Sequence, residues 1–447
     1  MSRLKAVFWG YLALLTILWL AASPDVFQPQ TFITLRNAFI QYSGVLAFGC
    51  MTLAIILALR SPLVEPWLGG VDKMYRLHKW AGIGALVLSL VHWIWTQLPK
   101  WAVSLGLMAQ RTRGERPQIE DPVQAFLMSM RGTAEGLGEW AFYLSVLLIS
   151  IALIEKIPYR WFYQIHRLFP VLYLILAFHT IVLLDFSDWL TPLGAVTVIM
   201  VAAGSYAAIV SLFRRIGARR RVDGTIASMQ HYPGVRSLET AITMETGWRG
   251  HKPGQFAFVV SDPREGAHPY TIASAWDAKD PKISFVTKEL GDHTTGLVQK
   301  LKIGQRVRIE GPYGCFTFDD DCSRQIWIGG GIGITPFIAR MKYLAQHPQD
   351  ARKIEIDLFH STRDEDSEAL RKLAEDAKAS NVRFHVLIES KHGRLTADRI
   401  REAVPDWQEA SIWFCGPPGF GDALRADFAA KGMNVKQRFH QELFQMR

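Results

Sequence analysis

The chain has 447 residues, of which 49% are hydrophobic, and its formal net charge is +9. This length exceeds that of one ordinary domain. The hydrophobic residues concentrate in the first half, which predicts a membrane-embedded part followed by a water-soluble part. The positive charge lies mainly beside the apolar stretches, so it indicates membrane topology and not a nucleic-acid ligand. The four cysteines lack metal-ligand spacing and form no disulfide pattern.

Six apolar stretches approach the roughly 20 residues that a helix needs to cross a bilayer. They lie at residues 6–22, 42–60, 79–97, 139–154, 165–184 and 193–213. The first is also compatible with a signal peptide, because Arg3 and Lys5 precede it and Ala21-Ala22-Ser23 offers a cleavage site. With six spans, most of the arginines and lysines beside the stretches fall on one side, which is then cytoplasmic. The loop 98–138 on the other side also carries basic residues, which weakens the contrast.

Two of these stretches carry two histidines each. His78 and His92 are 14 residues apart on the third stretch, and His166 and His179 are 13 apart on the fifth. An ionisable side chain inside a bilayer is a functional candidate by default, and neutral imidazole is a strong axial ligand of haem iron. At 1.5 Å per residue both pairs span about 20 Å. The spacing therefore predicts two haem b groups, one between His78 and His166 and one between His92 and His179.

The topology agrees with this pairing, but helix geometry does not fully agree. With six spans the third and fifth helices run parallel, so His78 and His166 lie near the cytoplasm, and His92 and His179 near the outer face. On an ideal helix, however, 13 residues leave the second ring of the fifth helix roughly 140° out of phase with the first. Pro170 lies between His166 and His179 and could kink or rewind that helix. The alternative is that each histidine simply bonds a neighbouring helix.

After Arg221 the pattern changes to short β-rich runs separated by Gly, Pro and Asp, which predicts a small antiparallel barrel. From Gln325 onward buried strands alternate with helices, which predicts a doubly wound parallel sheet. The predicted fold class is multidomain: a six-helix all-α transmembrane bundle, an antiparallel β-barrel domain and an α/β Rossmann-like nucleotide domain. We place the three domains at residues 1–215, 222–322 and 323–447.

Two motifs of the predicted barrel could hold a flat cofactor with a pyrophosphate. The stretch from His268 to Ser274 combines an aromatic ring with hydroxyl groups on one strand, although alone it is compatible with an ordinary strand. The stretch 288–295 has a glycine turn followed by small hydroxyl residues, which can present backbone N–H groups to a pyrophosphate. A plain capped helix start would have the same pattern.

Three motifs of the predicted parallel sheet follow strands, where nucleotides bind. Residues 329–336 read Gly-Gly-Gly-Ile-Gly-Ile-Thr-Pro, and glycines between a strand and a helix let the backbone approach a diphosphate. Ser361 and Arg363 could hold a ribose 2′-phosphate, which favours NADPH over NADH, unless Arg363 is only solvated. Cys415 begins Cys-Gly-Pro-Pro-Gly and could line the nicotinamide or be a small buried residue.

Together the soluble motifs resemble the ferredoxin–NADP⁺ reductase-type flavoprotein module. Behind six helices with two histidine pairs, the whole chain resembles the ferric reductase/NADPH oxidase superfamily from about residue 45 to residue 444. The resemblance implies FAD contacts from His268, Pro269, Tyr270, Thr271, Ser274, Gly291, His293 and Thr294. It implies nucleotide contacts from Gly330, Gly331, Gly333, Thr335, Ser361, Arg363, Gly416 and Pro417. The residues expected where hydride is transferred are Thr271, Cys415 and Phe444, the last of which would cover the flavin.

The resemblance also bears on the electron acceptor. Oxygen-reducing members carry a histidine one turn after the outer haem ligand of the third helix, and this chain has Thr96 there. We therefore expect a small-molecule acceptor outside the cytoplasm, with chelated ferric iron first and oxygen second, and a periplasmic redox protein is the third candidate. Arg36, at the outer end of the second helix, could pair with a haem propionate, guide an anionic acceptor or be an ordinary interfacial arginine.

The function expected from these features is electron transfer from NADPH, or from NADH, through FAD and two haems across a bacterial inner membrane, with the soluble domains in the cytoplasm. FAD is needed because a nicotinamide gives two electrons as hydride and a b-type haem takes one. A nucleotide-sensing transporter is the alternative from a different class, although it has no need of level-matched histidine pairs. A quinol-linked cytochrome b would leave the flavin module without a role.

Overall fold

The computed structural model describes residues 2–28, 31–109, 119–154, 156–291 and 293–442. It divides into two compact units. The first, which we call the helical unit, comprises Met1–Val64 and Lys73–Ile216. The second, the soluble unit, comprises Glu65–Asp72 and Gly217–Met446, so it is built from two separate parts of the chain.

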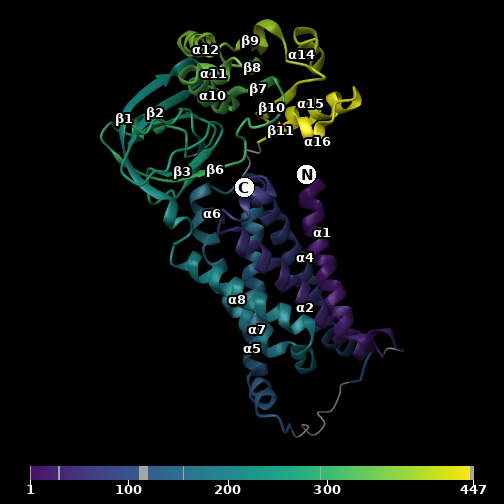
Figure 1. Cartoon of the computed structure of the whole chain (residues 1–447). Helices are drawn as coiled ribbons and strands as arrows, with labels where there is room; N and C mark the ends of the chain where they lie inside the picture. The colour runs from purple at the N-terminus through teal and green to yellow at the C-terminus, as the bar shows by residue number, and fades with distance from the viewer. Residues whose placement is uncertain (1, 29–30, 110–118, 155, 292, 443–447) are drawn as a thin grey trace. The chain divides into compact units, whose positions relative to one another are not determined.

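The described part of the helical unit contains six helices that are long and apolar enough to cross a membrane, which confirms the predicted all-α bundle (Figure 1). Five are single helices, and the remaining span joins the short α6 to α7. The helices are α1 (Ser2–Ala22), α2 (Phe32–Leu57), α4 (Val71–Ser104), α5 (Pro122–Leu153), α6 (Tyr159–His166), α7 (Phe169–Leu183) and α8 (Pro192–Leu212).

Three of these helices extend well beyond the apolar stretches that identified them, and one of them is α2, which begins at Phe32 and not near residue 42. Helix α4 continues through Pro99 to Ser104, and α5 begins at Pro122, so much of the stretch 98–138, which we expected to be a loop, is helical. The start of α5 has a clear local cause. The carboxylate of Asp121 accepts hydrogen bonds from the N–H groups of Val123 (2.8 Å) and Gln124 (2.9 Å). A search for apolar residues detects the bilayer-crossing part of a helix and misses its polar end.

The predicted fifth helix is interrupted between its two histidines. Helix α6 ends at His166 and α7 begins at Phe169, with Pro170 in the first turn of α7. A proline is tolerated there because the first N–H groups of a helix have no helical acceptor. Since His166 and His179 lie on different helices, the phase difference expected on one ideal helix does not apply.

A glycine lets three helices of the bundle meet at one tyrosine. The Tyr173 hydroxyl on α7 donates to Met200 O on α8 (2.9 Å) and lies 2.9 Å from Thr52 Oγ1 on α2. A Cβ atom at Gly204 would overlap the Tyr173 hydroxyl. The ring of Phe48 on α2 stacks against Tyr173 at a centroid distance of 5.3 Å, so this contact is part of the core of the unit.

The first sheet of the soluble unit is the predicted antiparallel one, with strand order β4-β3-β6-β1-β2-β5. Alternate residues point into a buried apolar core that includes Ile226, Ile242, Ile283 and Ile309. The strands are β1 (Arg221–Tyr232), β2 (Ser237–Met244), β3 (Phe256–Val260), β4 (His268–Thr271), β5 (Lys282–Lys288) and β6 (Arg306–Tyr313), and the short α9 (Leu297–Lys300) lies between β5 and β6.

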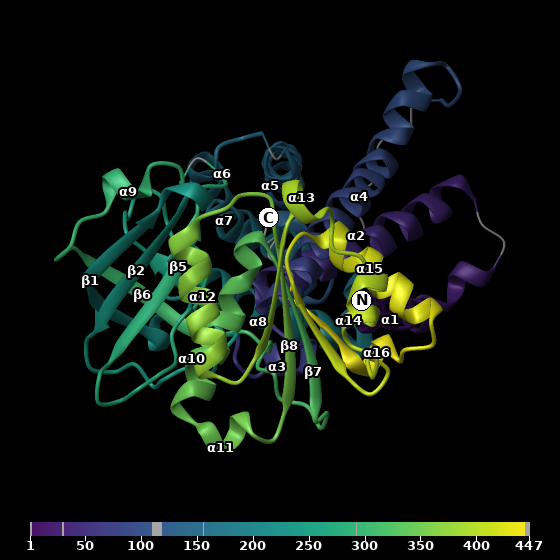
Figure 2. The same cartoon turned by 90° about the horizontal axis from the view of Figure 1, so that it is seen from above.

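The second sheet is parallel with strand order β11-β10-β7-β8-β9, as predicted for the α/β part. Helices α10 and α12 cover one face, and α14 and α15 cover the other (Figure 2). Its strands are β7 (Arg324–Gly330), β8 (Glu355–Thr362), β9 (Arg383–Ile388), β10 (Ser411–Cys415) and β11 (Phe439–Gln441). Its helices are α10 (Thr335–Gln346), α11 (Pro348–Ala351), α12 (Ser367–Ala379), α13 (Glu389–His392), α14 (Ala397–Ala403), α15 (Pro418–Ala430) and α16 (Val435–Arg438).

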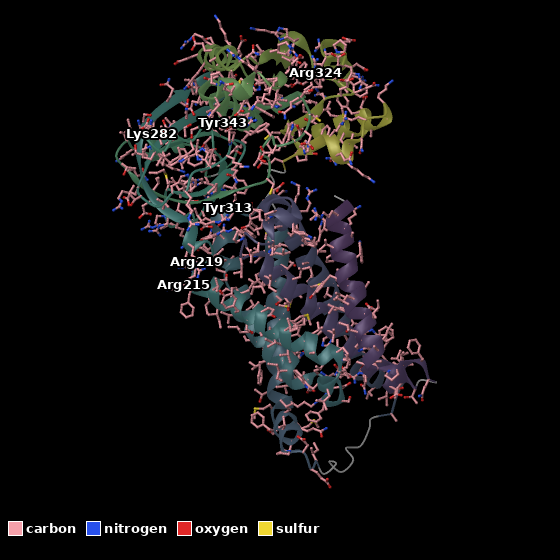
Figure 3. All side chains as sticks on the ribbon, viewed as in Figure 1. Arg215, Arg219, Lys282, Tyr313, Arg324 and Tyr343 are labelled. Atoms are coloured by element: carbon pink, nitrogen blue, oxygen red, sulfur yellow. The ribbon has the colours of Figure 1, made fainter. Side chains whose placement is uncertain are left out.

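The connector between α2 and α4 is folded as part of the soluble unit. It contains the short helix α3 (Glu65–Leu68), in which Glu65 is buried and accepts a hydrogen bond from the N–H of Gly314 (2.6 Å) at the end of β6. Arg220 lies 3.7 Å from the Glu65 carboxylate and over the ring of Tyr313, which is labelled in Figure 3. Burial raises the pKa of Glu65, against the opposing effects of Gly314 and Arg220.

Candidate functional site

The structure brings the four membrane histidines together in two pairs, with the same partners that the sequence spacing suggested. The ring centroids of His78 on α4 and His166 on α6 are 5.9 Å apart. Those of His92 on α4 and His179 on α7 are 6.3 Å apart. Helix α4 thus contributes one ring to each pair, and the interrupted α6–α7 span contributes the other.

Three of the four rings are oriented by a carbonyl group of a neighbouring helix. The Nδ1 atom of His78 lies 2.8 Å from Ala54 O, that of His92 lies 3.0 Å from Ile40 O, and that of His179 lies 2.8 Å from Ala134 O. Because a carbonyl only accepts, each Nδ1 carries the proton and each Nε2 is left with a lone pair. In metal sites a ligating histidine commonly donates its other ring N–H to such a carbonyl, and this hydrogen bond orients the ring.

His166 is held differently. Its Nδ1 atom is buried and has no hydrogen-bond partner among the residues that the structure describes. Instead the ring packs between Phe162 (centroid distance 5.1 Å) and Phe169 (4.9 Å), which flank the break between α6 and α7. Because no described residue bonds this nitrogen, hydrogen bonding within the described residues does not fix which ring nitrogen of His166 carries the proton.

The two ring separations fit a metal ion with one imidazole on each side. A metal–nitrogen bond of about 2 Å to each ring places two opposed ring centres about 6 Å apart. Three of the four imidazoles are left with an Nε2 lone pair available, and the spacing of both pairs fits two haem groups, each of which would be held by α4 and by α6 or α7.

Small residues make room for the rings of the second pair. A Cβ atom on Gly138 of α5 would overlap His179 Nδ1, and one on Gly44 of α2 would lie 3.3 Å from His92 Cε1. Ser43, next to Gly44, places its hydroxyl 3.3 Å from His92 Nδ1. Glycine at position 138 is therefore a requirement for the observed position of the His179 ring.

A proline in α4 leaves a carbonyl group free to accept a hydrogen bond from Arg36 of α2. Pro99 has no N–H, so the carbonyl of Trp95, four residues earlier in α4, lacks its usual helical donor. The Nε of Arg36 donates to this carbonyl at 3.2 Å. Arg36 lies one turn before Ile40 on α2, and the Ile40 carbonyl accepts from His92 of the second pair. Thr96, one turn after His92, donates its hydroxyl to Trp93 O at 2.7 Å.

In the soluble unit the two predicted FAD motifs meet at a pair of stacked imidazoles. The rings of His268 on β4 and His293 after β5 are 3.6 Å apart and nearly parallel, at 5°. Burial and then the neighbouring His293 lower the pKa of His268 to about 3, so His268 is neutral at pH 7. Thr294 closes the adjoining turn, because its Oγ1 accepts from the N–H groups of Leu290 and Gly291 (2.9 and 3.1 Å).

The predicted nucleotide residues gather at the carboxyl edge of the parallel sheet. Gly330 on β7 is in register with Ser361 on β8, and Gly329 is in register with Cys415 on β10. A Cβ atom on Gly333 would overlap Cys415 O. The glycines therefore let the turn after β7 lie against the Cys415–Pro417 segment. This turn leads directly into α10, whose first N–H groups can bind a phosphate.

Some candidate residues make hydrogen bonds or packing contacts within the protein itself. The Thr335 hydroxyl donates to Ile332 O (2.7 Å), and Ser274 Oγ accepts from Ser284 N (3.1 Å). Thr271 is buried on β4, opposite Phe256 of β3. Phe444 lies outside the described residues.

Cys415 is fully buried, and its Sγ lies 3.9 Å from Glu442 Oε2. Burial and the Glu442 carboxylate raise the pKa of the Cys415 thiol, so it remains protonated at neutral pH. The sequence reasoning missed Glu442 as a neighbour of Cys415, because 27 residues separate the two and no motif spans them.

The antiparallel and parallel sheets are joined by buried or half-buried ion pairs. Glu239 on β2 contacts Lys372 of α12 (2.7 Å) and Lys342 of α10 (3.7 Å), and Lys288 at the end of β5 contacts Asp364 (2.7 Å). Beside them is a cavity whose lining includes Gly331, Ile332, Thr362, Lys288, Lys342 and Lys372. The cavity reaches the glycine turn at which we expect the nucleotide diphosphate.

Buried histidines of the soluble unit predict a loss of stability in mild acid. Burial lowers the pKa of His360 and of His251 from 6.5 to about 4. The unfolded chain therefore takes up protons between pH 6.5 and pH 4 while the folded chain does not, and stability falls as the pH falls through this range. Each histidine should lower the free energy of unfolding by about 3 kcal/mol as the pH falls from 6.5 to 4. We expect the midpoint temperature of thermal unfolding of the detergent-solubilised chain to be lower at pH 4.5 than at pH 7. The difference should be smaller in His360→Asn. Equal pH slopes for both proteins would contradict this assignment.

Comparisons with known proteins assign all three parts of the chain. Residues 43–177 match the family of the ferric reductase like transmembrane component, residues 237–317 match an FAD-binding domain, and residues 327–426 match an oxidoreductase NAD-binding domain. The first of these ranges contains three of the four membrane histidines, and the fourth, His179, lies two residues beyond it. The other two ranges contain most of the soluble residues predicted from motifs.

Individual relatives resemble parts of the chain. A flavohemoprotein of Oceanobacillus iheyensis is 26% identical over 43% of this chain and 51% of its own length. The ferredoxin reductase component of a 3-ketosteroid-9-alpha-monooxygenase of Rhodococcus rhodochrous is 29% identical over 51% of this chain and 66% of its own length. The crystal structure of the Amycolatopsis cytochrome P450 reductase GcoB aligns with 25% identity over 51% of this chain and 71% of its own, at a TM-score of 0.43. The chain thus spans about half to two thirds of these two curated relatives. By its matched parts, the chain joins a ferric reductase-like transmembrane component to an FAD-binding domain and an oxidoreductase NAD-binding domain.

Proposed function

We propose that the chain is a transmembrane oxidoreductase that takes electrons from NADPH, with NADH as the alternative, and delivers them across the membrane to an acceptor on the opposite side. FAD in the soluble unit and two b-type haems in the helical unit would be its cofactors. We place it in a bacterial inner membrane with the soluble unit in the cytoplasm. Chelated ferric iron is the acceptor that we favour.

One observation carries this proposal. The helical unit holds two pairs of facing imidazoles, and three of the four rings are oriented by a carbonyl on another helix. A transporter has no evident use for two such pairs, whereas two haems need them. The same chain carries matched FAD-binding and NAD-binding domains, which supply a source of electrons.

The cofactors supply the redox chemistry, because a flavin accepts a hydride and releases single electrons, and a haem carries one electron at a time. The residues of the chain bind and orient them. The glycine turn after β7 and the start of α10 are suited to a diphosphate. Cys415 and Glu442 lie at the adjoining strand end, and burial keeps the Cys415 thiol protonated. The carbonyls of Ala54, Ile40 and Ala134 hold their imidazoles in the tautomer that leaves Nε2 available for iron.

The choice of acceptor rests on the surroundings of the second histidine pair. Thr96 stands where the oxygen-reducing oxidases carry a histidine, and its hydroxyl is bonded to its own helix. Oxygen is therefore the second candidate acceptor, and a periplasmic redox protein is the third.

An anaerobic absorption spectrum of the purified chain with FAD, before and after NADPH, tests the proposal. We expect the bands of low-spin b-type haem to appear on addition of NADPH. Reduction by dithionite but not by NADPH would contradict the electron path, and a protein that binds no haem would support the transporter alternative. Ferric citrate should then reoxidise the haem faster than an equal concentration of oxygen does, and the reverse order would replace ferric iron by oxygen as the acceptor.

A further inference from the structure

The hairpin that joins β1 to β2 lies against the parallel sheet. Its tip contains the short 3₁₀ helix η4 (Pro233–Val235), and it meets the β8–α12 loop, which we define as residues 361–366. The N–H of Gly234 donates to Asp366 Oδ2 at 3.0 Å, although 132 residues separate the two. A Cβ atom on Gly234 would overlap Glu365 O. The hairpin tip therefore packs so closely on this loop that position 234 requires glycine.

The Asp366 carboxylate joins this hairpin to helix α12. Its Oδ1 accepts from the N–H of Ala369 at 3.0 Å, which makes Asp366 the N-cap of α12. Its Oδ2 accepts from Gly234, so each oxygen holds a different segment. A carboxylate can do this because both of its oxygens accept hydrogen bonds. One side chain thus connects the hairpin tip of the antiparallel sheet to the first turn of α12.

Two further contacts connect the antiparallel sheet to the same loop and helix. Lys288 at the end of β5 pairs with Asp364 at 2.7 Å, and the lysine side chain is only 14% exposed. Lys372 of α12 pairs with Glu239 of β2 at 2.7 Å. A pair that is shielded from water, as that of Lys288 is, is weakened less by salt than an exposed pair. The antiparallel sheet therefore holds the β8–α12 loop at Asp364 as well as at Asp366.

The β8–α12 loop lies on the path of the expected nucleotide. Gly330 of β7 is in register with Ser361, the first residue of the loop. The cavity that reaches the glycine turn is lined by Thr362 of the loop and by Tyr232 and Val235 of the hairpin. A nucleotide whose diphosphate lies at the glycine turn would next meet this loop, since β8 is the neighbour of β7. The hairpin thus supplies one wall of the cavity and holds another.

We propose that Gly234 and Asp366 are positioning residues for nucleotide binding, through which the hairpin tip holds the β8–α12 loop where the nucleotide needs it. This inference rests on the proposed function. The glycine turn and the Cys415–Pro417 segment are held by a separate contact, that of Gly333 with Cys415. Loss of the hairpin contact should therefore weaken nucleotide binding, while hydride transfer from a nucleotide that has bound keeps its normal rate.

The kinetic test uses the full chain in detergent with FAD and follows anaerobic reduction by NADPH or NADH, whichever is the better donor. In Gly234→Ala we expect the KM for that nucleotide to rise about tenfold, because the methyl group separates the hairpin tip from the loop. The kcat and the FAD content should stay within about twofold of the wild type. Lys282→Ala is the control and should leave the KM unchanged. This lysine, labelled in Figure 3, begins β5 and pairs with Asp280 in the turn before that strand at 3.0 Å.

A second variant separates positioning from general stability. Asp366→Asn keeps an N-cap residue of similar strength, but its amide has a single oxygen and cannot hold both N–H groups as the carboxylate does. We expect the KM to rise in this variant too. The double variant Gly234→Ala/Asp366→Asn should be no weaker than Gly234→Ala alone, because both changes break the same contact. Additive effects of the two substitutions would overturn the inference.

A binding measurement makes the inference independent of electron transfer. Calorimetric titration of the full chain with NADP⁺, or with NAD⁺ if NADH is the better donor, should show about tenfold weaker binding in Gly234→Ala and no change in Lys282→Ala. If neither NADPH nor NADH reduces haem in the wild type but binding still depends on Gly234, the proposed function fails and this inference stands. If the wild type binds neither nucleotide, if Gly234→Ala binds as tightly as the wild type, or if that variant loses FAD, the inference is overturned.

Discussion

Replacing Gly138 by alanine should lower the content of the two proposed haem groups in the purified protein by about half, through loss of the outer one. A Cβ atom at this position would overlap Nδ1 of His179, and the backbone of α5 cannot withdraw without separating α5 from α7. The ring would be forced away from Ala134 O, which now fixes it at 2.8 Å, and from His92. The measurement is haem stoichiometry by pyridine haemochrome, together with the redox titration of the remaining haem.

The matched control for this prediction lies half a turn away on the same helix. Gly136→Ala adds the same methyl group to α5, but nothing lies within 4 Å of its new Cβ. We expect this variant to keep both haems and to gain slightly in helix propensity. Full haem content in Gly138→Ala, or an equal loss in both variants, would show that the His179 ring does not need the space at position 138.

The second large effect should come from Gly333→Ala, which should raise the KM for NADPH by about a hundredfold while leaving FAD bound. The added Cβ would overlap Cys415 O and lie 3.0 Å from Gly416 N, and both of these are backbone atoms of β10 and its turn that cannot rotate away. The glycine turn would therefore move off the sheet edge at which the diphosphate is expected. Steady-state kinetics with NADPH and flavin content by absorbance measure the two parts of this prediction.

Gly419→Ala serves as the control at the same end of the sheet. Its Cβ would meet nothing within 4 Å in the first turns of α15, so nucleotide affinity should not change. A Gly333→Ala protein that loses FAD as well would indicate general unfolding of the soluble unit. Unchanged NADPH kinetics would show that the nucleotide does not use this turn.

The sequence predicts most strongly those features that depend on local spacing. The bundle, the two sheets and the partners of the histidine pairs follow from apolar stretches, strand patterns and the helical rise between His78 and His92. The orientation of His166 was not predictable, because it depends on a break at Arg167 and Leu168 that the apolar pattern runs straight through. Pro170 was a signal of that break, but its geometry requires the surrounding helices.

Contacts between distant residues were beyond the reach of motif reasoning. Arg363 stood out because it follows a strand, whereas its ion-pair partner Glu389, at 2.9 Å, comes 26 residues later and looks like an ordinary surface charge in the sequence. Pro99 is visible in the sequence, but its effect on Arg36 is not. That effect requires α2 to pack beside the Trp95 carbonyl, which the proline leaves without a helical donor. Such partners are determined by how helices and strands pack, and a single sequence does not encode that packing in any local pattern.

The Glu65 connector imposes an order on biosynthesis. Glu65 bonds to Gly314, which is 249 residues further along the chain. At 5–20 residues per second a ribosome needs about 10–50 s to make the intervening chain. During that time α2 and α4 can enter the bilayer, but the connector between them remains at the membrane surface, where Glu65 has no Gly314 to bond. A soluble protein that begins at Gly217 would in turn lack Glu65 and leave a buried backbone N–H at Gly314. The reductase part of this chain is thus expected to mature only when it is made together with its first helices.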